Sequence, residues 1–394
     1  MQLKTTILFQ LKWMVEHIKS SNDNFCALPF GHTTITTNGN YSVCCIHTTP
    51  PEHQVNINQD KLTHWLKSDY LQQVRQSFLD AERHPGCNEC WINEDLGQDS
   101  MRTRTSKEYK ILGVNESTKF PVNIEVQIGN LCNLHCLMCS EKHSSAILAE
   151  NIKLKINQYN QDDFKWSDTA FENLQEIIST GPKVLTVIGG EPLYNKKFLS
   201  ILENLSKESC RHTSLQIVTN ATQWNERWKK ALQKFKLVRI MFSVDATESL
   251  YEYMRYPGVW KETESNIDQI VTGSNIKPLV NCVIQNLNIG SIGSIIQWAK
   301  NKNLYLQLDQ LIGPSWLSII NLPRHLKINA IAHLETVLEW DLTDHLKQQL
   351  TSYRTQLTDS MEYPDNLAAW KEFQTQVGLR DRLRNNSYTQ FLPE

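Results

Sequence analysis

The sequence lacks the features that mark several common classes of protein. Its formal net charge is only −2 over 394 residues, so it has no excess of basic charge for coating nucleic acid. It also has no glycine-rich phosphate loop and no stripe of basic and aromatic residues. An apolar stretch at residues 7–15, interrupted by Gln10 and Lys12, is too short to span a bilayer, and no small-residue cleavage site follows it. We therefore expect a helix or strand at residues 7–15, a cytoplasmic location, and neither a membrane nor nucleic acid as a partner.

Cysteine, by contrast, is plentiful, since the chain has ten. Without an export signal, this number indicates metal ligands or reduced thiols rather than a disulfide framework. Most of these cysteines fall into two groups, one between residues 26 and 90 and one between residues 132 and 139. Each group predicts a metal centre.

The second group is the more distinctive. Cys132, Cys136 and Cys139 follow an apolar run at residues 122–128, which predicts a strand. Loops at the carboxyl ends of strands are where α/β folds place their chemistry. Thiolates select zinc, copper(I) or iron–sulfur clusters, and structural zinc normally takes four protein ligands. Three close thiolates without an obvious fourth therefore favour a cubane cluster with one open iron over a zinc knuckle.

This Cys-x3-Cys-x2-Cys spacing resembles the signature of the radical S-adenosylmethionine (radical SAM) superfamily. The resemblance implies that Cys132, Cys136 and Cys139 hold a 4Fe–4S cluster whose open iron is chelated by the methionine moiety of the cofactor. It also implies that one electron cleaves the cofactor to a 5′-deoxyadenosyl radical, which abstracts hydrogen from a substrate. His135 and Met138 would shape the pocket around the cluster.

From residue 121 onward, strand patterns alternate with helix patterns, which is typical of a parallel sheet built from βαβ units. A helix is predicted at residues 166–179, with Ser167 as its N-cap. Six strands match the partial (β/α)6 barrel of the radical SAM superfamily, so the predicted fold class is α/β. These strands are predicted at residues 122–128, 184–188, 215–220, 238–245, 278–285 and 304–311.

The strand ends carry the residues that the resemblance assigns to the cofactor. The second strand ends in Gly-Gly-Glu-Pro, where glycines permit close approach of the backbone and a carboxylate suits an ammonium group. A serine and an aspartate two positions apart at the end of the fourth strand share one face, and a guanidinium suits a carboxylate. At the end of the fifth strand, either Gln285 or Asn286 would lie near the adenine. The implied cofactor-binding residues are Gly189, Gly190, Glu191, Pro192, Asn220, Ser243, Asp245 and Arg255.

The first group of cysteines has its own framework. An Asn38-Gly39 pair between two β-branched runs predicts a hairpin, and a helix is predicted at residues 62–80. The hairpin and a later Cys-x2-Cys turn would bring four thiolates to one centre, for which zinc is the plain alternative. The candidate ligands are Cys26, Cys87, Cys90 and one of the adjacent pair Cys44 and Cys45.

These elements resemble a twitch domain, the shortened relative of the SPASM domain that holds an auxiliary iron–sulfur cluster in many radical SAM enzymes. In this chain the motif precedes the barrel, which resembles the subgroup with an N-terminal twitch domain. The family's glycine usually stands five residues before its cysteine, so Gly39 favours Cys44, with Cys45 as the alternative. The auxiliary cluster is expected to be 4Fe–4S. The polar stretch at residues 94–115 is interpreted as a linker.

The chain is predicted to have three parts. Residues 1–115 form the α+β twitch domain, residues 116–320 form the barrel, and residues 321–394 form a helical tail that serves as a packing layer. Apolar residues at three- and four-residue steps predict three helices in this tail. These helices are expected at residues 324–340, 343–358 and 364–384.

The predicted activity is that of a radical SAM enzyme that abstracts hydrogen from a peptide or protein side chain, a substrate favoured by analogy alone. The alternatives are dehydrogenation or epimerisation of a sugar or other small molecule and, in a different class, a non-catalytic zinc or iron–sulfur protein. Cys282 on the fifth strand, and Tyr305 and Asp309 on one face of the sixth, are candidate catalytic residues. An electron donor such as flavodoxin or ferredoxin is an expected partner.

Overall fold

The computed structural model describes residues 24–392, so the element predicted at residues 7–15 lies outside the described residues. The chain divides into two compact units. Among the described residues, the first unit comprises residues 24–34 and 40–124, and the second comprises residues 35–39 and 125–392. Within residues 24–392, no helix has both the length and the apolar character that a membrane span requires.

The first unit combines short helices with two short strands. The predicted hairpin is present as neighbouring strands β1 and β2, and Gly39 between them has a φ of +86°, which favours glycine. The elements are α2 (Leu28–Gly31), β1 (His32–Ile35), β2 (Tyr41–Ser42), α3 (Leu62–Lys67), α4 (Asp69–Leu79), α5 (Asn88–Asp95) and α6 (Met101–Ile111).

Two predictions for this unit are wrong in detail. The single helix at residues 62–80 is divided into α3 and α4 at Ser68, whose backbone is extended and whose Oγ accepts the N–H of Leu71 at 3.3 Å. Serine competes for backbone hydrogen bonds in this way, and it therefore starts a new helix. The linker expected at residues 94–115 contains the helix α6, which begins at a capping box made by Ser100 and Thr103.

The second unit is built on strands in the order β3-β4-β5-β6-β7-β8, and each neighbouring pair from β4 to β8 is parallel. The predicted strands are confirmed to within about two residues at each end. The strands are β3 (Asn123–Gln127), β4 (Val184–Ile188), β5 (Ser214–Thr219), β6 (Leu237–Ser243), β7 (Ile276–Ile284) and β8 (Tyr305–Gln310).

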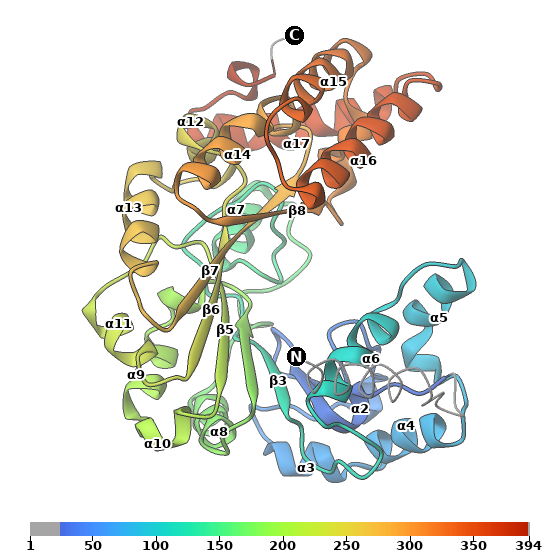
Figure 1. Cartoon of the computed structure of the whole chain (residues 1–394), viewed down its shortest axis with the longest axis vertical. Coiled ribbons are helices and arrows are strands. Elements are labelled where there is room, and N and C mark those ends of the chain that lie inside the picture. The colour runs from blue at the N-terminus through green and yellow to red at the C-terminus, as the bar shows by residue number, and fades with distance from the viewer. Residues whose placement is uncertain (1–23, 393–394) are drawn as a thin grey trace, which may run out of the picture. The chain divides into compact units, whose positions relative to one another are not determined.

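Helices connect these strands, and α9, α11 and α13 lie along one side of them (Figure 1). The N-cap expected at Ser167 is confirmed, because its Oγ accepts the N–H of Ala170 at 3.2 Å. The connecting helices are α7 (Ser145–Leu154), α8 (Asp168–Ser179), α9 (Lys196–Asn204), α10 (Lys207–Cys210), α11 (Glu226–Leu232), α12 (Glu248–Met254), α13 (Trp260–Ile270) and α14 (Ile292–Asn301).

Alternation along the strands separates two faces. In β5 and β6, every second residue is fully buried toward the helices, and the intervening residues are only partly buried or exposed. The partly buried face is polar: it carries Gln127 on β3, Gln216 on β5, Asn281 on β7 and Asp309 on β8. A polar inner face suits a substrate cleft better than a packed core.

The predicted helical tail is confirmed as α15 (Arg324–Leu338), α16 (Asp344–Ser360) and α17 (Leu367–Arg384). These helices gather beside β8 (Figure 1). Each helix buries some of its apolar residues, among them Leu334 on α15, Leu350 on α16 and Phe373 on α17. One end of α17 has a different character, which is described below.

Candidate functional site

The three cysteines of the second unit lie on a loop that follows β3 and is held by hydrogen bonds from several elements. The N–H of Cys132 donates to Ser145 Oγ at 3.1 Å. The N–H groups of His135 and Leu137 donate to the carbonyls of Tyr256 and Met254 at 2.6 and 3.0 Å. The segment around each of the first two cysteines is therefore fixed by a neighbouring element.

The Gly-Gly-Glu-Pro end of β4 packs directly against this loop. A Cβ added to Gly190 would lie 2.2 Å from the carbonyl oxygen of Leu131, and one added to Gly189 would lie 2.9 Å from the backbone of Gln127. Both glycines also have positive φ values of +86° and +23°. The close approach that only glycine permits is made here to the backbone that carries Cys132.

Glu191, the next residue, is buried with 1% exposure. Its carboxylate accepts the N–H of Leu193 at 2.9 Å, the hydroxyl of Thr219 at 2.6 Å and the N–H of Asn220 at 2.6 Å. Burial nevertheless raises the pKa of Glu191 to about 7. A carboxylate offers about four acceptor positions, so one remains for a further donor.

Asn220 connects the end of β5 to the cysteine loop. Its Nδ2 donates to Asn133 Oδ1 at 3.2 Å, and Asn133 in turn donates to Thr222 Oγ1 at 2.9 Å. Asn220 Oδ1 accepts from Thr222 as well, at 2.7 Å. The structure therefore places this predicted cofactor residue next to the cysteine loop, with its amide already bonded.

Asp245 and Arg255 form a buried ion pair, with Asp245 Oδ2 2.7 Å from Arg255 Nη2. Arg255 Nη1 also donates to the sulfur of Cys136 at 3.8 Å, and Asp245 Oδ1 accepts the N–H of Val283 at 2.9 Å. Burial alone would lower the pKa of Arg255, but Asp245 and Cys136 raise it. These two predicted cofactor residues thus contact each other and one of the cysteines.

The end of β7 carries amides whose polar atoms are buried without a partner. Both side-chain atoms of Gln285 and the Oδ1 atoms of Asn281 and Asn286 have no hydrogen-bond partner among the described residues. Asn286 Nδ2 donates to the carbonyl of Trp316 at 3.1 Å, so Asn286 is partly satisfied and Gln285 is not. Buried polar atoms of this kind are costly unless a ligand or water pairs with them.

Of the three candidate catalytic residues, Tyr305 and Asp309 share the less buried face of β8, whereas Cys282 lies on the buried face of β7. Cys282 is fully buried, and its Sγ donates to the carbonyl of Asp245 at 3.5 Å. Asp309 Oδ1 accepts from Gln307 at 2.7 Å, and Tyr305 is 53% exposed. Glu125 on β3 faces the same polar side of the sheet and was missed, although its alternation with Ile124 and Val126 was a readable signal.

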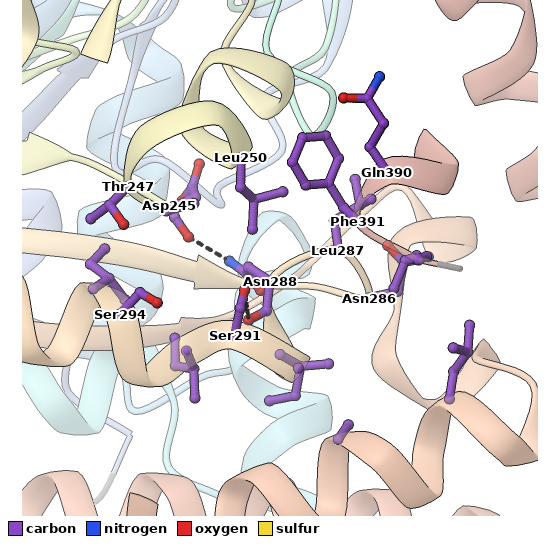
Figure 2. Close-up of a pocket in the computed structure, with 18 of the residues that line it drawn as sticks. Asp245, Thr247, Leu250, Asn286, Leu287, Asn288, Ser291, Ser294, Gln390 and Phe391 are labelled. Carbon is purple, nitrogen blue, oxygen red and sulfur yellow. Dashed lines mark hydrogen bonds between the residues drawn. The ribbon is translucent and has the colours of Figure 1, made fainter. Parts of the chain in front are cut away.

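Figure 2 shows a pocket of about 430 Å³ at the carboxyl ends of β6 and β7. Thr247 and Leu250 lie on one side, and Phe391 reaches it from a distant segment. The side chain of Asn288 donates to the carbonyl of Asp245 at 2.9 Å. The lining is made of hydroxyls, amides, apolar side chains and the carboxylates of Asp245 and Glu248, with no lysine or arginine among the described lining residues.

The first unit brings its own cysteines together around a cavity of about 20 Å³. Burial raises the pKa of Cys26 and of Cys87, each to about 12, with further rises from their neighbouring cysteines. Cys45 is exposed and does not line the cavity. The cysteines that line it are Cys26, Cys44, Cys87 and Cys90.

Two polar side chains adjoin this cavity. Arg102 lines it and forms a two-pronged ion pair with Glu94, through one hydrogen bond of 3.0 Å and a second, shorter one. His47 Nδ1 lies 3.4 Å from Cys87 Sγ, and its Nε2 lies 2.9 Å from the hydroxyl of Tyr70. Burial lowers the pKa of His47 to about 4, so its ring is neutral. If Tyr70 donates to Nε2, then Nδ1 carries the proton that faces Cys87.

A family model described as the radical SAM superfamily matches residues 126–277, and one described as an iron–sulfur cluster-binding domain (SPASM) matches residues 26–91. The chain belongs to the radical SAM superfamily. In this chain the iron–sulfur domain precedes the radical SAM domain, as predicted. The two domains imply S-adenosylmethionine with a 4Fe–4S cluster, and an auxiliary iron–sulfur cluster.

The residues of the radical SAM domain fit these groups. The three thiols of the loop are close enough to raise one another's pKa, and burial raises the pKa of Cys132 to about 12. Metal binding deprotonates such thiols, and iron favours soft sulfur ligands. The unpartnered amide of Gln285 and the remaining acceptor position of Glu191 suit a ligand with several polar groups.

The curated proteins similar to this chain do not share one name. A GTP 3′,8-cyclase of Caulobacter vibrioides is 25% identical over 194 residues, which are 47% of this chain and 50% of that protein. The sporulation killing factor maturation protein SkfB of Bacillus subtilis is 20% identical over 187 residues, which are 47% of this chain and 41% of that protein. The chain spans about half the length of the curated relatives it matches.

Solved structures with a similar chain path include native anSMEcpe with bound AdoMet, at 17% identity and a TM-score of 0.38 over 54% of this chain and 59% of that one. Streptococcus suis SuiB bound to the precursor peptide SuiA matches at 14% identity and a TM-score of 0.38, over 73% of this chain and 63% of that one.

Proposed function

We propose that Cys132, Cys136 and Cys139 hold the catalytic 4Fe–4S cluster. The observation that carries this assignment is the packing of Gly190 onto the backbone of Leu131, because it joins the two most specific motifs of the sequence into one site. For the auxiliary cluster we propose Cys44 rather than Cys45, since Cys44 lines the cysteine cavity. The other auxiliary ligands are Cys26, Cys87 and Cys90. The proposed parts of the chain are residues 1–115, 116–320 and 321–394.

When bound, the reduced cluster supplies the electron that converts the cofactor to a hydrogen-abstracting radical. The residues of this chain bind and orient the cofactor and exclude water from the site. Glu191 has one acceptor position left and a pKa raised to about 7, which supports its contact with the cofactor's ammonium group. The ion pair of Asp245 with Arg255 favours a holding role for both residues over the direct cofactor contact that the resemblance implies. Ser243 and Gln285 are then the residues proposed to contact the polar groups of the cofactor's adenosine.

The substrate that the chain supports best is a peptide or protein. In the described strands β3 to β8, Arg239 and Lys277 lie near the amino ends of their strands, and no lysine or arginine occupies the carboxyl-terminal halves that face the site. The pocket in Figure 2 likewise has no lysine or arginine in its lining, and the charged residues that it does contain, Asp245 and Glu248, are acidic. A triphosphate would need guanidinium or ammonium partners, whereas amides and hydroxyls suit a peptide backbone. The printed name of SkfB describes a maturation protein, which supports the same choice.

A nucleotide is the second candidate, because the names of several curated relatives are GTP 3′,8-cyclase. A sugar or other small molecule is the third. The test is to incubate the reduced, cluster-loaded protein and cofactor with a peptide library, with GTP or with a sugar panel, and to follow 5′-deoxyadenosine. Substrate-dependent 5′-deoxyadenosine above the uncoupled level with GTP alone would overturn the peptide proposal.

The cluster assignment is tested first. After anaerobic reconstitution, wild type should carry about eight irons, four for each cubane cluster. A Cys132→Ala/Cys136→Ala/Cys139→Ala variant should keep about four irons and form no 5′-deoxyadenosine. A colourless wild-type protein with stoichiometric zinc would instead support a non-catalytic zinc protein. Cytoplasmic location and a flavodoxin or ferredoxin donor remain predictions, and reduction by either purified donor would test the latter.

A further inference from the structure

The last turn of α17 carries charged residues that are buried. Arg380, Asp381 and Arg384 are 6, 8 and 9% exposed, although charged side chains are rarely buried without a specific partner. They lie at the end of a helix whose other buried residues are apolar. These side chains are therefore expected to have specific polar partners in addition to their packing contacts.

Arg384 contacts the cysteine loop itself. Its Nη2 donates to the carbonyl oxygen of His135 at 2.9 Å, one residue before Cys136. The same guanidinium forms two hydrogen bonds to the carboxylate of Glu150 on α7, at 2.8 and 3.0 Å. It also lies 5.1 Å from the centre of the Tyr256 ring, and the Tyr256 carbonyl accepts the N–H of His135. The peptide that leads into Cys136 is thus held from both sides.

Arg380, one turn earlier, reaches the other end of the loop. Its Nη2 donates to Asn151 Oδ1 at 3.0 Å, and Asn151 Nδ2 donates to Glu141 Oε1 at 2.6 Å. The carbonyl of Glu141 accepts from Asn130 Nδ2 at 2.9 Å. Residues 130 and 141 bracket the three cysteines, so this chain of hydrogen bonds closes the base of the loop.

Asp381 supplies a third connection. Its Oδ1 accepts the hydroxyl of Tyr253 on α12 at 2.9 Å, two residues before Arg255. Arg255 in turn donates to Cys136 Sγ. One helical turn therefore contacts both chain segments that approach Cys136.

Packing alone does not account for this arrangement. A buried ion pair is often no more stabilising than well-packed apolar residues of similar volume, because burying charge is costly. A guanidinium that bonds a main-chain carbonyl next to a metal ligand does fix the ligand's direction, which an apolar side chain cannot do. Partners of this kind commonly change metal affinity by about 10- to 100-fold.

We infer that α17 is a positioning element for the catalytic cluster, in which Arg384 and Arg380 brace the two ends of the cysteine loop through Glu150 and Asn151. The inference rests on the proposed function, since it takes the three cysteines as the cluster ligands. Arg384 is the positioning residue with the most direct effect, because it bonds the loop backbone itself.

The test measures how fast the catalytic cluster is lost from the full chain. Reconstituted wild type and variants are exposed to an iron chelator, and the remaining catalytic cluster is quantified by the change that S-adenosylmethionine makes to the EPR spectrum of the reduced protein. Arg384→Met should lose this cluster about ten times faster than wild type. Arg384→Lys, which keeps the charge but not the forked geometry, should fall between the two. Arg382→Gln, an exposed position two residues away, should match wild type.

A second variant separates positioning from the cost of an unpaired buried charge. Arg384→Met/Glu150→Gln removes the carboxylate charge but keeps an amide oxygen for Arg380, whose Nε lies 3.3 Å from Glu150 Oε1. It should recover much of the thermal unfolding midpoint that Arg384→Met loses, while cluster loss stays fast because the carbonyl of His135 still lacks its donor. If the double variant recovers both properties, or if Arg384→Met loses its cluster at the wild-type rate, the inference is overturned. If wild type itself shows no cofactor-sensitive signal, the proposed function fails instead.

Discussion

The two cysteine centres differ in how their charges are satisfied. In the first unit, the cavity between Cys26, Cys44, Cys87 and Cys90 is small, and the adjacent carboxylate of Glu94 has its own cation in Arg102. In the second unit, three cysteines share a loop, and the nearby carboxylate of Glu191 has no ion-pair partner within 4 Å among the described residues. On the proposed assignment, the first centre takes all four cluster ligands from cysteine side chains. The second takes three from cysteines and needs a further ligand for its cluster and for Glu191. Closed sites of this kind suit structure or electron transfer, and open ones suit chemistry.

The largest effect is expected when the centre of the first unit, lined by Cys26, Cys44, Cys87 and Cys90, is removed alone. Cys87→Ala/Cys90→Ala should halve the iron content, from about eight to about four, because it removes two of four ligands to one cluster. The cofactor-sensitive EPR signal should persist. Cys45→Ala is the matched control and should keep all the iron, since Cys45 is exposed. Loss of the cofactor-sensitive signal in the double variant would show that the two centres are not independent.

A second prediction concerns the contact that shapes the open centre. Gly190→Ala should lower the free energy of unfolding by about 2–3 kcal/mol and reduce iron loading, because the new methyl group would meet the Leu131 carbonyl oxygen at 2.2 Å. Gly290→Ala, whose new methyl group would meet nothing within 4 Å, should behave as wild type. Denaturant unfolding and iron analysis check both variants. Equal stability of the two would contradict the packing described here.

The third prediction compares how the carboxylates of Glu191 and Glu94 change the free energy of unfolding with pH. Burial raises the pKa of Glu191 from its ordinary 4.5 to about 7, so between these values the unfolded chain has lost a proton that the folded chain keeps. The contribution of Glu191 to the free energy of unfolding without cofactor should therefore fall as pH rises through this window, by up to about 3 kcal/mol. Glu94 contributes in the opposite sense, because Arg102 and Ser100 outweigh burial and lower its pKa, so its contribution is lost as pH falls.

In the cofactor-free protein, the thermal unfolding midpoint of wild type relative to that of Glu191→Gln should decline between about pH 5 and about pH 7. Glu94→Gln should leave that decline in place. Parallel pH profiles for wild type and Glu191→Gln would mean that Glu191 does not carry the proton that burial predicts.

The smallest expected effect lies at the closed centre. His47→Phe removes the ring nitrogen Nδ1, which lies 3.4 Å from Cys87 Sγ, and keeps an aromatic ring in place. Hydrogen bonds to cluster sulfurs raise the reduction potential, so the auxiliary cluster should shift to a more negative potential without loss of iron. His53→Phe, at the exposed histidine stacked on Tyr70, serves as the control. An unchanged potential in His47→Phe would assign the Nδ1 proton elsewhere.

Local patterns were sufficient for much of this molecule. The strands and the C-terminal helices follow from hydrophobic period and turn residues, and these predictions are confirmed. The same local reasoning joined α3 and α4 into one helix, because the apolar period continues across Ser68 while the cap interrupts the backbone. It also interpreted α6 as a linker, since its sequence is mostly polar.

Contacts between distant segments were not readable. Arg384 and His135 are separated by 249 positions, and no sequence pattern near either residue indicates that the two are in contact. The pairing of Asp245 with Arg255 was hidden for a different reason, because each residue alone suits a bound cofactor and only the geometry shows that they form an ion pair. Sequence patterns locate the chemistry of this chain, and the structure shows which side chains are already engaged.

The distance between Arg384 and His135 along the chain also has a consequence for the order of events during synthesis. The ribosome makes the cysteine loop long before it makes α17, so the growing chain presents the thiols on an unbraced segment. Contacts of such long range form late, after much of the loop-closure entropy has been lost. On the proposed assignment, we expect cluster delivery to have an interval in which the loop is accessible, and docking of α17 to end that interval.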